Sequence, residues 1–161
     1  MKIVSKADLN RILLLFLLSI CSIASSFSQS PYVKKYQPVA DSLSRQYGIP
    51  TGVILGVAII ESGSGTSRNA RLLNNHFGIV GKNNVLKTHG IKTMYRQFPT
   101  IEDSYVAFAK LVASKPYYAK LKGNPSCEAW VTSISNYGYS TQPAAWRKTI
   151  MNAIRKSGLM K

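Results

Sequence analysis

One stretch constrains the fold of this chain more than any other: residues 48–65, GIPTGVILGVAIIESGSG. Its part from Val53 to Ile60 is apolar on every side, which is typical of a helix buried all around. Pro50 suits the first turn of a helix, because its ring fixes φ and its missing N–H is not needed there. Gly63 and Gly65 then end the helix. We therefore expect a core helix against which the other elements pack.

Glu61 is the one ionisable side chain of this stretch, and it lies where the apolar helix opens into a Gly-rich turn. Burial disfavours the charged form of a carboxyl group and raises its pKa, as a general acid that works near neutral pH requires. The alternative is an ordinary glutamate at a helix end, since few charged residues are buried in proteins. Chemistry alone leaves both interpretations open.

The first 28 residues have the pattern of a secretory signal peptide. A basic beginning precedes the mainly apolar residues 12–23, and small residues follow up to Ser28. The apolar run is short for a membrane span, so we expect cleavage rather than an uncleaved anchor. Cys21 lies in a sequence that faintly resembles a lipoprotein box, and the sequence does not decide whether it is lipidated.

The remaining residues, 29–161, have the length of one domain. The whole chain has a net charge of +15, and the part after residue 28 keeps 18 basic and 5 acidic side chains. Such an excess in an exported protein predicts attraction to a polyanion, although a basic surface can also serve solubility alone. No nucleic-acid-binding module is present. We expect a monomer with no nucleic-acid partner and no stable membrane insertion after cleavage.

Cysteine and histidine are too scarce for a disulfide or a metal site. After cleavage only Cys127 remains, which excludes an intrachain disulfide and is typical of a small buried side chain. His76 and His89 are too few, and too far along the chain from acidic residues, to suggest metal ligands. We expect no metal and no cofactor.

Apolar residues at helical spacing predict further helices around the core helix. The predicted helices cover residues 36–47, 67–73, 100–112, 117–121, 126–137 and 143–156. Between them, Ile79–Val80 and Ile91–Phe98 have the β-branched and aromatic content of strands, separated by a polar, turn-rich segment. The predicted fold class is mainly α (α+β), a helical domain with one small β-hairpin lobe.

Two motifs, in this order, resemble a known family. ESGxG at residues 61–65, followed by NNxFGIxG at residues 74–81, is similar to the β-N-acetylglucosaminidase domains of glycoside hydrolase family 73. That family includes the peptidoglycan-cleaving domain of the flagellar rod-cap protein and bacterial autolysins. YRxF at residues 95–98 and YGYST at residues 137–141 match in the same order. The resemblance spans roughly residues 39–154 and implies a lysozyme-like fold.

The resemblance implies a secreted peptidoglycan hydrolase that cleaves the β-1,4 bond after N-acetylglucosamine. Glu61 would be the general acid that protonates the glycosidic oxygen, and Tyr139 would stabilise charge in the transition state. The implied substrate-binding residues are Ser62, Asn75, Phe77, Gly78, Tyr137 and Thr141. The basic surface fits glycan strands that carry lactyl-peptide carboxylates. The enzyme would act in the periplasm, outside the cell or at the cell wall.

The chain departs from the family at the second carboxylate. Many members carry another Glu in the β-hairpin, but no Asp or Glu lies between Glu61 and Glu102 here, and Gln142 replaces a family Asp. A two-carboxylate mechanism needs both groups roughly 5–9 Å apart around the bond. We therefore expect a single-acid mechanism assisted by the substrate's 2-acetamido group. The sequence does not decide between inversion and retention.

Two alternatives remain open. Lytic transglycosylases and goose-type lysozymes also use one Glu followed by Ser, but they cut after N-acetylmuramic acid, so the masses of the products separate them from a glucosaminidase. A non-catalytic, cationic wall-binding module is the alternative from another class, consistent with the missing second carboxylate. Such a module would bind sacculi and release nothing.

Overall fold

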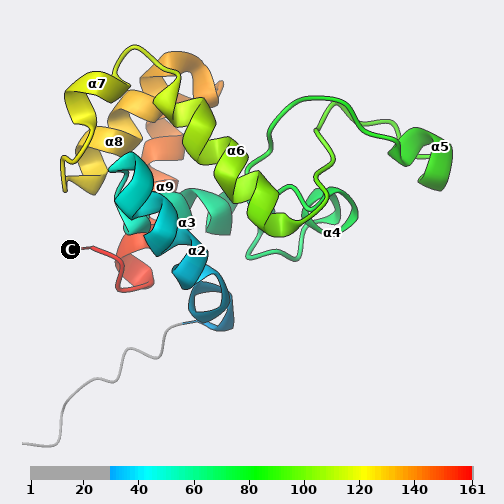
Figure 1. Cartoon of the computed structure of the whole chain (residues 1–161), viewed down its shortest axis with the longest axis horizontal. Coiled ribbons are helices and arrows are strands. Elements are labelled where there is room, and N and C mark those ends of the chain that lie inside the picture. Colours follow the sequence, from blue (N-terminus) through cyan, green and yellow to red (C-terminus); the bar gives the residue numbers. More distant parts are fainter. Residues whose placement is uncertain (1–29, 161) are drawn as a thin grey trace, which may run out of the picture.

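The computed structural model describes residues 30–160 of this 161-residue chain. The expected signal peptide and Cys21 lie outside the described residues. Helices make up most of the described part (Figure 1), which confirms the mainly α class. They are α2 (Pro31–Tyr47), α3 (Thr51–Ser62), α4 (Arg68–Leu73), α5 (Val85–His89), α6 (Ile101–Ala113), α7 (Tyr118–Leu121), α8 (Cys127–Ile134), the π-helical turn η1 (Ser135–Tyr139) and α9 (Pro143–Lys156). Within residues 30–160, no helix combines the length and hydrophobicity needed to cross a bilayer.

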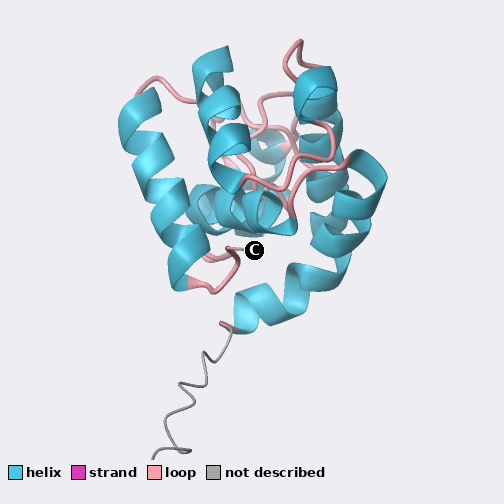
Figure 2. Ribbon diagram, turned by 90° about the vertical axis from the view of Figure 1, so that its left-hand side faces the viewer, coloured by secondary structure: helices cyan, strands magenta, loops and turns pink. Residues whose placement is uncertain are grey.

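Helix α3 lies at the centre of the domain, as its sequence predicts. Its residues from Gly52 to Ala58 are buried, and α2, α8 and α9 pack against it. Figure 1 labels these helices, and Figure 2 shows the helical body turned by 90°. Gly56 permits the close approach of α9, because a Cβ atom at this position would lie 2.5 Å from Cγ1 of Ile154. Burial of apolar surface on every side of α3 is the main favourable contribution to the stability of this core.

Short polar residues begin several of the surrounding helices. Ser30, Ser67 and Ser126 each accept a hydrogen bond from a backbone N–H in the first turn of α2, α4 and α8. Thr100 and Asp103 form a capping box at the start of α6, in which Asp103 N donates to Thr100 Oγ1 at 3.1 Å. These caps fix where the helices start, and hence how α4 and α6 meet the segment between them.

The predicted β-hairpin lobe is wrong for the described residues. Val80 and Tyr95 form a single isolated antiparallel bridge, and α5 occupies the middle of the segment. Next to the bridge, the Asn83 side chain joins the two segments, since its Nδ2 donates to the carbonyl oxygens of Thr93 and Tyr95 at 3.0 and 2.8 Å. The segments are thus held together by side-chain hydrogen bonds and a single bridge instead of a regular ladder. In Figure 1 the segment of residues 79–98, here called the arm, extends away from the helical body with α5 at its end.

The segment around Tyr139 follows the prediction in part. The sequence predicts a helix through Tyr137 and then a loop; α8 ends at Ile134, and in the turn η1 that follows, the backbone angles of Tyr137 and Gly138 are non-helical. Gly138, at φ 84°, lies in the left-handed region that glycine adopts without strain. Tyr139 is partly buried and packs against the hydrophobic core. The chain therefore returns inward at Tyr139 instead of remaining an outer loop.

Candidate active site

Glu61 lies in the last turn of α3, which ends at Gly63 with φ 57°. The side chain is partly buried, and burial raises the pKa of its carboxyl group above the ordinary value. One oxygen is held in place, because Trp146 Nε1 donates to Glu61 Oε1 at 2.7 Å. That hydrogen bond opposes part of the rise in the pKa, but burial is the larger effect. The carboxyl group is thus both desolvated and fixed in orientation.

Trp146 is a site residue that the sequence did not reveal. Its aromatic ring suits a core position at the start of the last helix, and it is 8% exposed. A buried indole N–H nonetheless needs an acceptor, and here the acceptor is Glu61. Trp146 follows Glu61 by 85 residues, so only the packing of α9 against α3 brings them together. The need for an acceptor was the one available signal.

The second oxygen of Glu61 faces the loop after α4. Glu61 Oε2 lies 3.5 Å from the point where a Cβ atom of Gly78 would stand, and Cε1 of Tyr95 lies 3.8 Å from the same point. Gly78 also has φ 65°, which favours glycine. The free side of the carboxyl group therefore opens toward Gly78, with the ring of Tyr95 beside it. Tyr95, which the sequence placed in a predicted strand and in the YRxF motif without a role, is a second residue of the site that sequence reasoning did not assign.

Tyr139 lies on another side of the same site. Its O–H donates to the carbonyl oxygen of Phe77 at 2.7 Å, and its ring centre lies 5.4 Å from that of Trp146. Burial, with the nearby Glu61 carboxylate, raises the pKa of Tyr139 well above its ordinary value, so the phenol stays protonated. The structure thus brings Tyr139, Trp146 and Gly78 together around Glu61.

Three of the predicted substrate-binding side chains are enclosed. Asn75 is 2% exposed; its amide donates to the carbonyls of Ile79 and Arg96 and accepts from the N–H groups of Phe77 and Ile79. The ring of Phe77 stacks on that of Phe108, with the ring centres 4.4 Å apart. These two side chains therefore shape the loop that carries Gly78.

Ser62 is also fully buried. Its hydroxyl donates to Ala58 O at 2.6 Å and accepts from Gly65 N at 2.8 Å. These bonds close the turn that follows Glu61. Ser62 therefore holds the backbone behind the carboxyl group.

The two remaining predicted residues are exposed. Tyr137 is 52% exposed, and its ring centre lies 4.9 Å from that of Tyr117. Thr141 lies on the surface just beyond η1. Both flank Tyr139 in the sequence and have side chains free to meet a ligand.

The other acidic residues between positions 30 and 160 have separate structural places. Asp41 accepts a hydrogen bond from Thr51 Oγ1 at 2.6 Å, Asp103 belongs to the capping box, and Glu128 lies in the first turn of α8. Glu102 is exposed in the first turn of α6. In the described part of the chain, no three His, Cys, Asp or Glu side chains are grouped as metal ligands would be.

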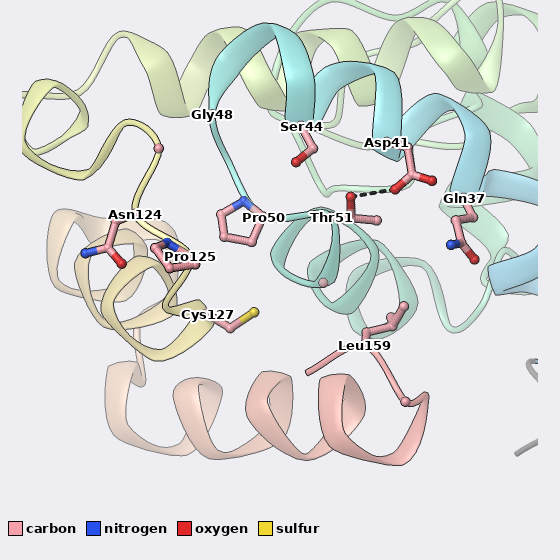
Figure 3. A pocket seen from close by; sticks show the side chains of 13 residues that line it. Gln37, Asp41, Ser44, Gly48, Pro50, Thr51, Asn124, Pro125, Cys127 and Leu159 are labelled. Carbon is pink, nitrogen blue, oxygen red and sulfur yellow. Dashed lines mark hydrogen bonds between the residues drawn. The ribbon is translucent and has the colours of Figure 1, made fainter. Parts of the chain in front are cut away.

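A separate hollow of about 460 Å³ lies at the opposite end of α3 (Figure 3). Asp41, Thr51, Asn124 and Cys127 are among the residues that line it. Thr51 begins α3, and Glu61 follows ten residues later, about 15 Å along a helix axis. This hollow is therefore distinct from the Glu61 site.

A helical domain whose core helix presents one desolvated glutamate among aromatic side chains has the arrangement of a lysozyme-like glycoside hydrolase. Residues 37–159 match the glucosaminidase family model, described as mannosyl-glycoprotein endo-β-N-acetylglucosaminidase. The chain therefore belongs to this family, glycoside hydrolase family 73, as its motifs indicate. Among curated proteins, none matches the chain.

Several solved structures share the fold. The catalytic domain of the autolysin Auto from Listeria monocytogenes is 19% identical, with a TM-score of 0.67, and the match covers 99% of this chain and 98% of that one. A glycoside hydrolase domain of FlgJ from Salmonella typhimurium is 20% identical, with a TM-score of 0.63 and coverages of 81% and 97%. A peptidoglycan hydrolase from Sphingomonas sp. A1 is 23% identical, with a TM-score of 0.59 and coverages of 78% and 90%. At these identities, the likeness shows the fold alone.

Proposed function

We propose that this protein is a peptidoglycan hydrolase that cleaves the β-1,4 bond after N-acetylglucosamine, with Glu61 as its general acid. The observation that carries the proposal is the Glu61 carboxyl group itself. It is desolvated, Trp146 holds one of its oxygens, and the other oxygen opens toward Gly78. The family membership and the autolysin and peptidoglycan hydrolase among the similar structures favour a wall glycan as the substrate.

The fixed oxygen determines where the acidic proton lies. Because Trp146 Nε1 donates to Oε1, the proton of the neutral acid belongs on Oε2. Oε2 faces the space beside Gly78 and Tyr95, where a glycosidic oxygen can approach. Glu61 then donates this proton to the leaving oxygen as the C1–O bond breaks.

A second carboxylate is replaced by the substrate in this proposal. The carbonyl oxygen of the 2-acetamido group attacks C1, forms an oxazolinium ring and carries the positive charge that develops. Water then opens the ring while the Glu61 carboxylate takes a proton from it, which restores the acid. Two successive displacements at C1 predict retention of the anomeric configuration. The route requires a 2-acetamido sugar on the glycone side, which N-acetylglucosamine supplies.

Tyr139 stabilises the positive charge of the transition state through its phenol oxygen. Its O–H is committed to the Phe77 carbonyl, so the lone pairs of the phenol oxygen remain available to face positive charge. We assign the cleft surface to Gly78, Tyr137, Thr141 and Tyr95. The buried Ser62, Asn75 and Phe77 support this surface from behind.

The site of action follows from the substrate. A wall hydrolase acts at the cell wall, and the pattern of residues 1–28 supports export to the periplasm or beyond. The excess of basic side chains supports binding to glycan strands that carry carboxylates. We propose that the protein acts as a monomer without a cofactor.

The test is digestion of purified peptidoglycan by the protein without residues 1–28, beside Glu61→Gln, with mass spectrometry of the reduced fragments. Fragments that end in reducible N-acetylglucosamine, absent with the variant, are expected. Anhydro-muramyl ends would instead identify a lytic transglycosylase, and reducible N-acetylmuramic acid ends a muramidase. Binding to sacculi without fragments would identify a wall-binding module.

A further inference from the structure

A buried polar cluster lies directly behind Glu61. It consists of Tyr32 from the first turn of α2, Ser62 at the end of α3, His76 from the loop after α4, and Tyr105 from α6. Their side chains are 8%, 0%, 1% and 0% exposed. Ser62 is the neighbour of Glu61, and His76 precedes Phe77, whose carbonyl holds Tyr139. The cluster therefore touches both backbone segments that form the site.

Tyr32 is the centre of the cluster. Its hydroxyl lies 2.7 Å from His76 Nδ1, 2.9 Å from the Tyr105 hydroxyl and 3.3 Å from Ser62 Oγ. Tyr32 thus joins, through one oxygen atom, three elements that are far apart in the sequence.

One arrangement of protons gives each hydroxyl hydrogen of the cluster an acceptor. Burial lowers the pKa of His76 to about 4, so its ring is neutral at neutral pH and Nδ1 can accept from Tyr32. Tyr105 then donates to the Tyr32 oxygen, and the Ser62 hydroxyl shares its hydrogen between Ala58 O at 2.6 Å and, more weakly, the Tyr32 oxygen at 3.3 Å. If these hydrogen bonds ran in the opposite direction, from His76 to Tyr32 and from Tyr32 to Tyr105, the hydroxyl hydrogen of Tyr105 would have no acceptor among the described residues.

We propose that Tyr32 and His76 are positioning residues, which hold the turn after Glu61 at a fixed separation from the loop that carries Gly78. The proposal deepens the proposed function and rests on it. Apolar side chains of similar size could fill the same space, but they would allow the two segments to slide. A satisfied buried network instead has one favourable geometry, because any shift leaves a polar group unpaired at a cost of about 1–3 kcal/mol.

The expected consequence is a loss of orientation at Glu61. In Tyr32→Phe the ring remains and the three hydrogen bonds are lost, so the turn after Glu61 is less constrained. We expect kcat to fall at least about tenfold, because misplacement of an acid by a fraction of an ångström is costly. KM should change less than about twofold, since neither Tyr32 nor His76 is placed on the cleft surface.

Tyr36→Phe is the matched control. Tyr36 belongs to the same aromatic group, its ring centre lying 4.8 Å from that of Tyr32, and it is 5% exposed. None of the hydrogen bonds found among the described side chains involves its hydroxyl. We expect Tyr36→Phe to keep the kcat of the wild type. His76→Gln, which retains an acceptor, should keep more activity than His76→Leu.

A readout that does not depend on activity completes the test. The pKa of Glu61 is measured by carboxyl-carbon NMR titration in the wild type, Tyr32→Phe and Tyr36→Phe. Tyr32→Phe should lower this pKa, because a loosened turn admits water to the carboxyl group, while Tyr36→Phe should leave it unchanged. An unchanged Glu61 pKa in Tyr32→Phe, or equal losses of kcat in both variants, would overturn the positioning role. A wild type that cuts no peptidoglycan would instead refute the proposed function, and the titration would still decide the role of Tyr32.

Discussion

At the scale of single residues, the chemistry depends on how two opposing effects meet at Glu61. Burial raises the pKa of the carboxyl group, and the indole N–H of Trp146 lowers it because a hydrogen bond to the charged form favours that form. Burial is the larger effect, so the carboxyl group keeps its proton to a higher pH than an ordinary glutamate does. Trp146 therefore affects the orientation of the Glu61 carboxyl group more than its pKa.

This balance predicts the behaviour of Trp146→Phe. The ring still packs, but the N–H donor is lost, so the pKa of Glu61 should rise further. The alkaline limb of the profile of kcat/KM against pH should therefore move to higher pH. At the optimum, kcat should fall because Oε1 is no longer held. A limb that stays in place or moves to lower pH would contradict this account of the site.

Sequence reasoning singled out Glu61 and missed its hydrogen-bond partner for a physical reason. Glu61 is marked by a local pattern, a lone carboxylate at the end of an apolar helix. Trp146 meets Glu61 only through a contact between distant segments, which no local pattern records, and the motif that contains Tyr95 did not indicate that its ring lies beside Glu61. Asn75 belongs to a recognisable motif, yet its hydrogen bonds serve the loop backbone. A motif thus located this segment without indicating which of its side chains face the cleft.

At the scale of elements, helices were predicted where periodicity and caps agree. The N-caps of α4, α6 and α8 are Ser67, Thr100 and Ser126, the residues at which the predicted helices begin. The β-hairpin prediction failed because the strand propensity of Ile91–Phe98 does not show how this segment pairs, and only a single bridge forms, beside the side-chain hydrogen bonds of Asn83. The turn η1 could likewise not be predicted from helical spacing, because it involves the left-handed backbone of Gly138 and the contact of Tyr139 with the distant Phe77.

The contact between α3 and α9 gives a prediction about stability. A methyl group at Gly56 would lie 2.5 Å from Ile154 Cγ1, so Gly56→Ala must push α9 away from α3. Overpacking of a core costs about 1–3 kcal/mol, which outweighs the gain in helix propensity from alanine. Urea denaturation should show this loss in the free energy of unfolding. Stability equal to or above that of the wild type would mean that α9 moves without cost.

At the scale of the whole molecule, the excess of basic side chains predicts that electrostatic attraction assists the encounter with the proposed substrate. From Glu61 to Glu102 the chain carries six Lys and Arg side chains and no intervening acid, and these residues include the arm with α5. Lys82, Lys87, Lys92 and Arg96 of this arm are exposed. The arm next to the site therefore presents cations to an anionic wall polymer.

Salt tests this contribution. Attraction between exposed charges is screened over about 8 Å at physiological ionic strength and over about 3 Å at 1 M. Binding of the protein to sacculi, measured by co-sedimentation, should therefore weaken as sodium chloride is raised. A variant with Lys82, Lys87 and Lys92 changed to Gln should bind less tightly at low salt and show a smaller dependence on salt. Binding that does not respond to salt would exclude an electrostatic role for this surface.

The central claim is that one carboxylate suffices for cleavage. The most direct measurement compares kcat on the same peptidoglycan for the wild type, Glu61→Gln, Glu102→Gln and Glu128→Gln, each checked for folding by circular dichroism. The account predicts that Glu61→Gln loses at least about a hundredfold, as expected for removal of a general acid, while the other two keep most of the activity. A comparable loss in folded Glu102→Gln or Glu128→Gln would contradict the single-acid mechanism and reveal a second catalytic carboxylate.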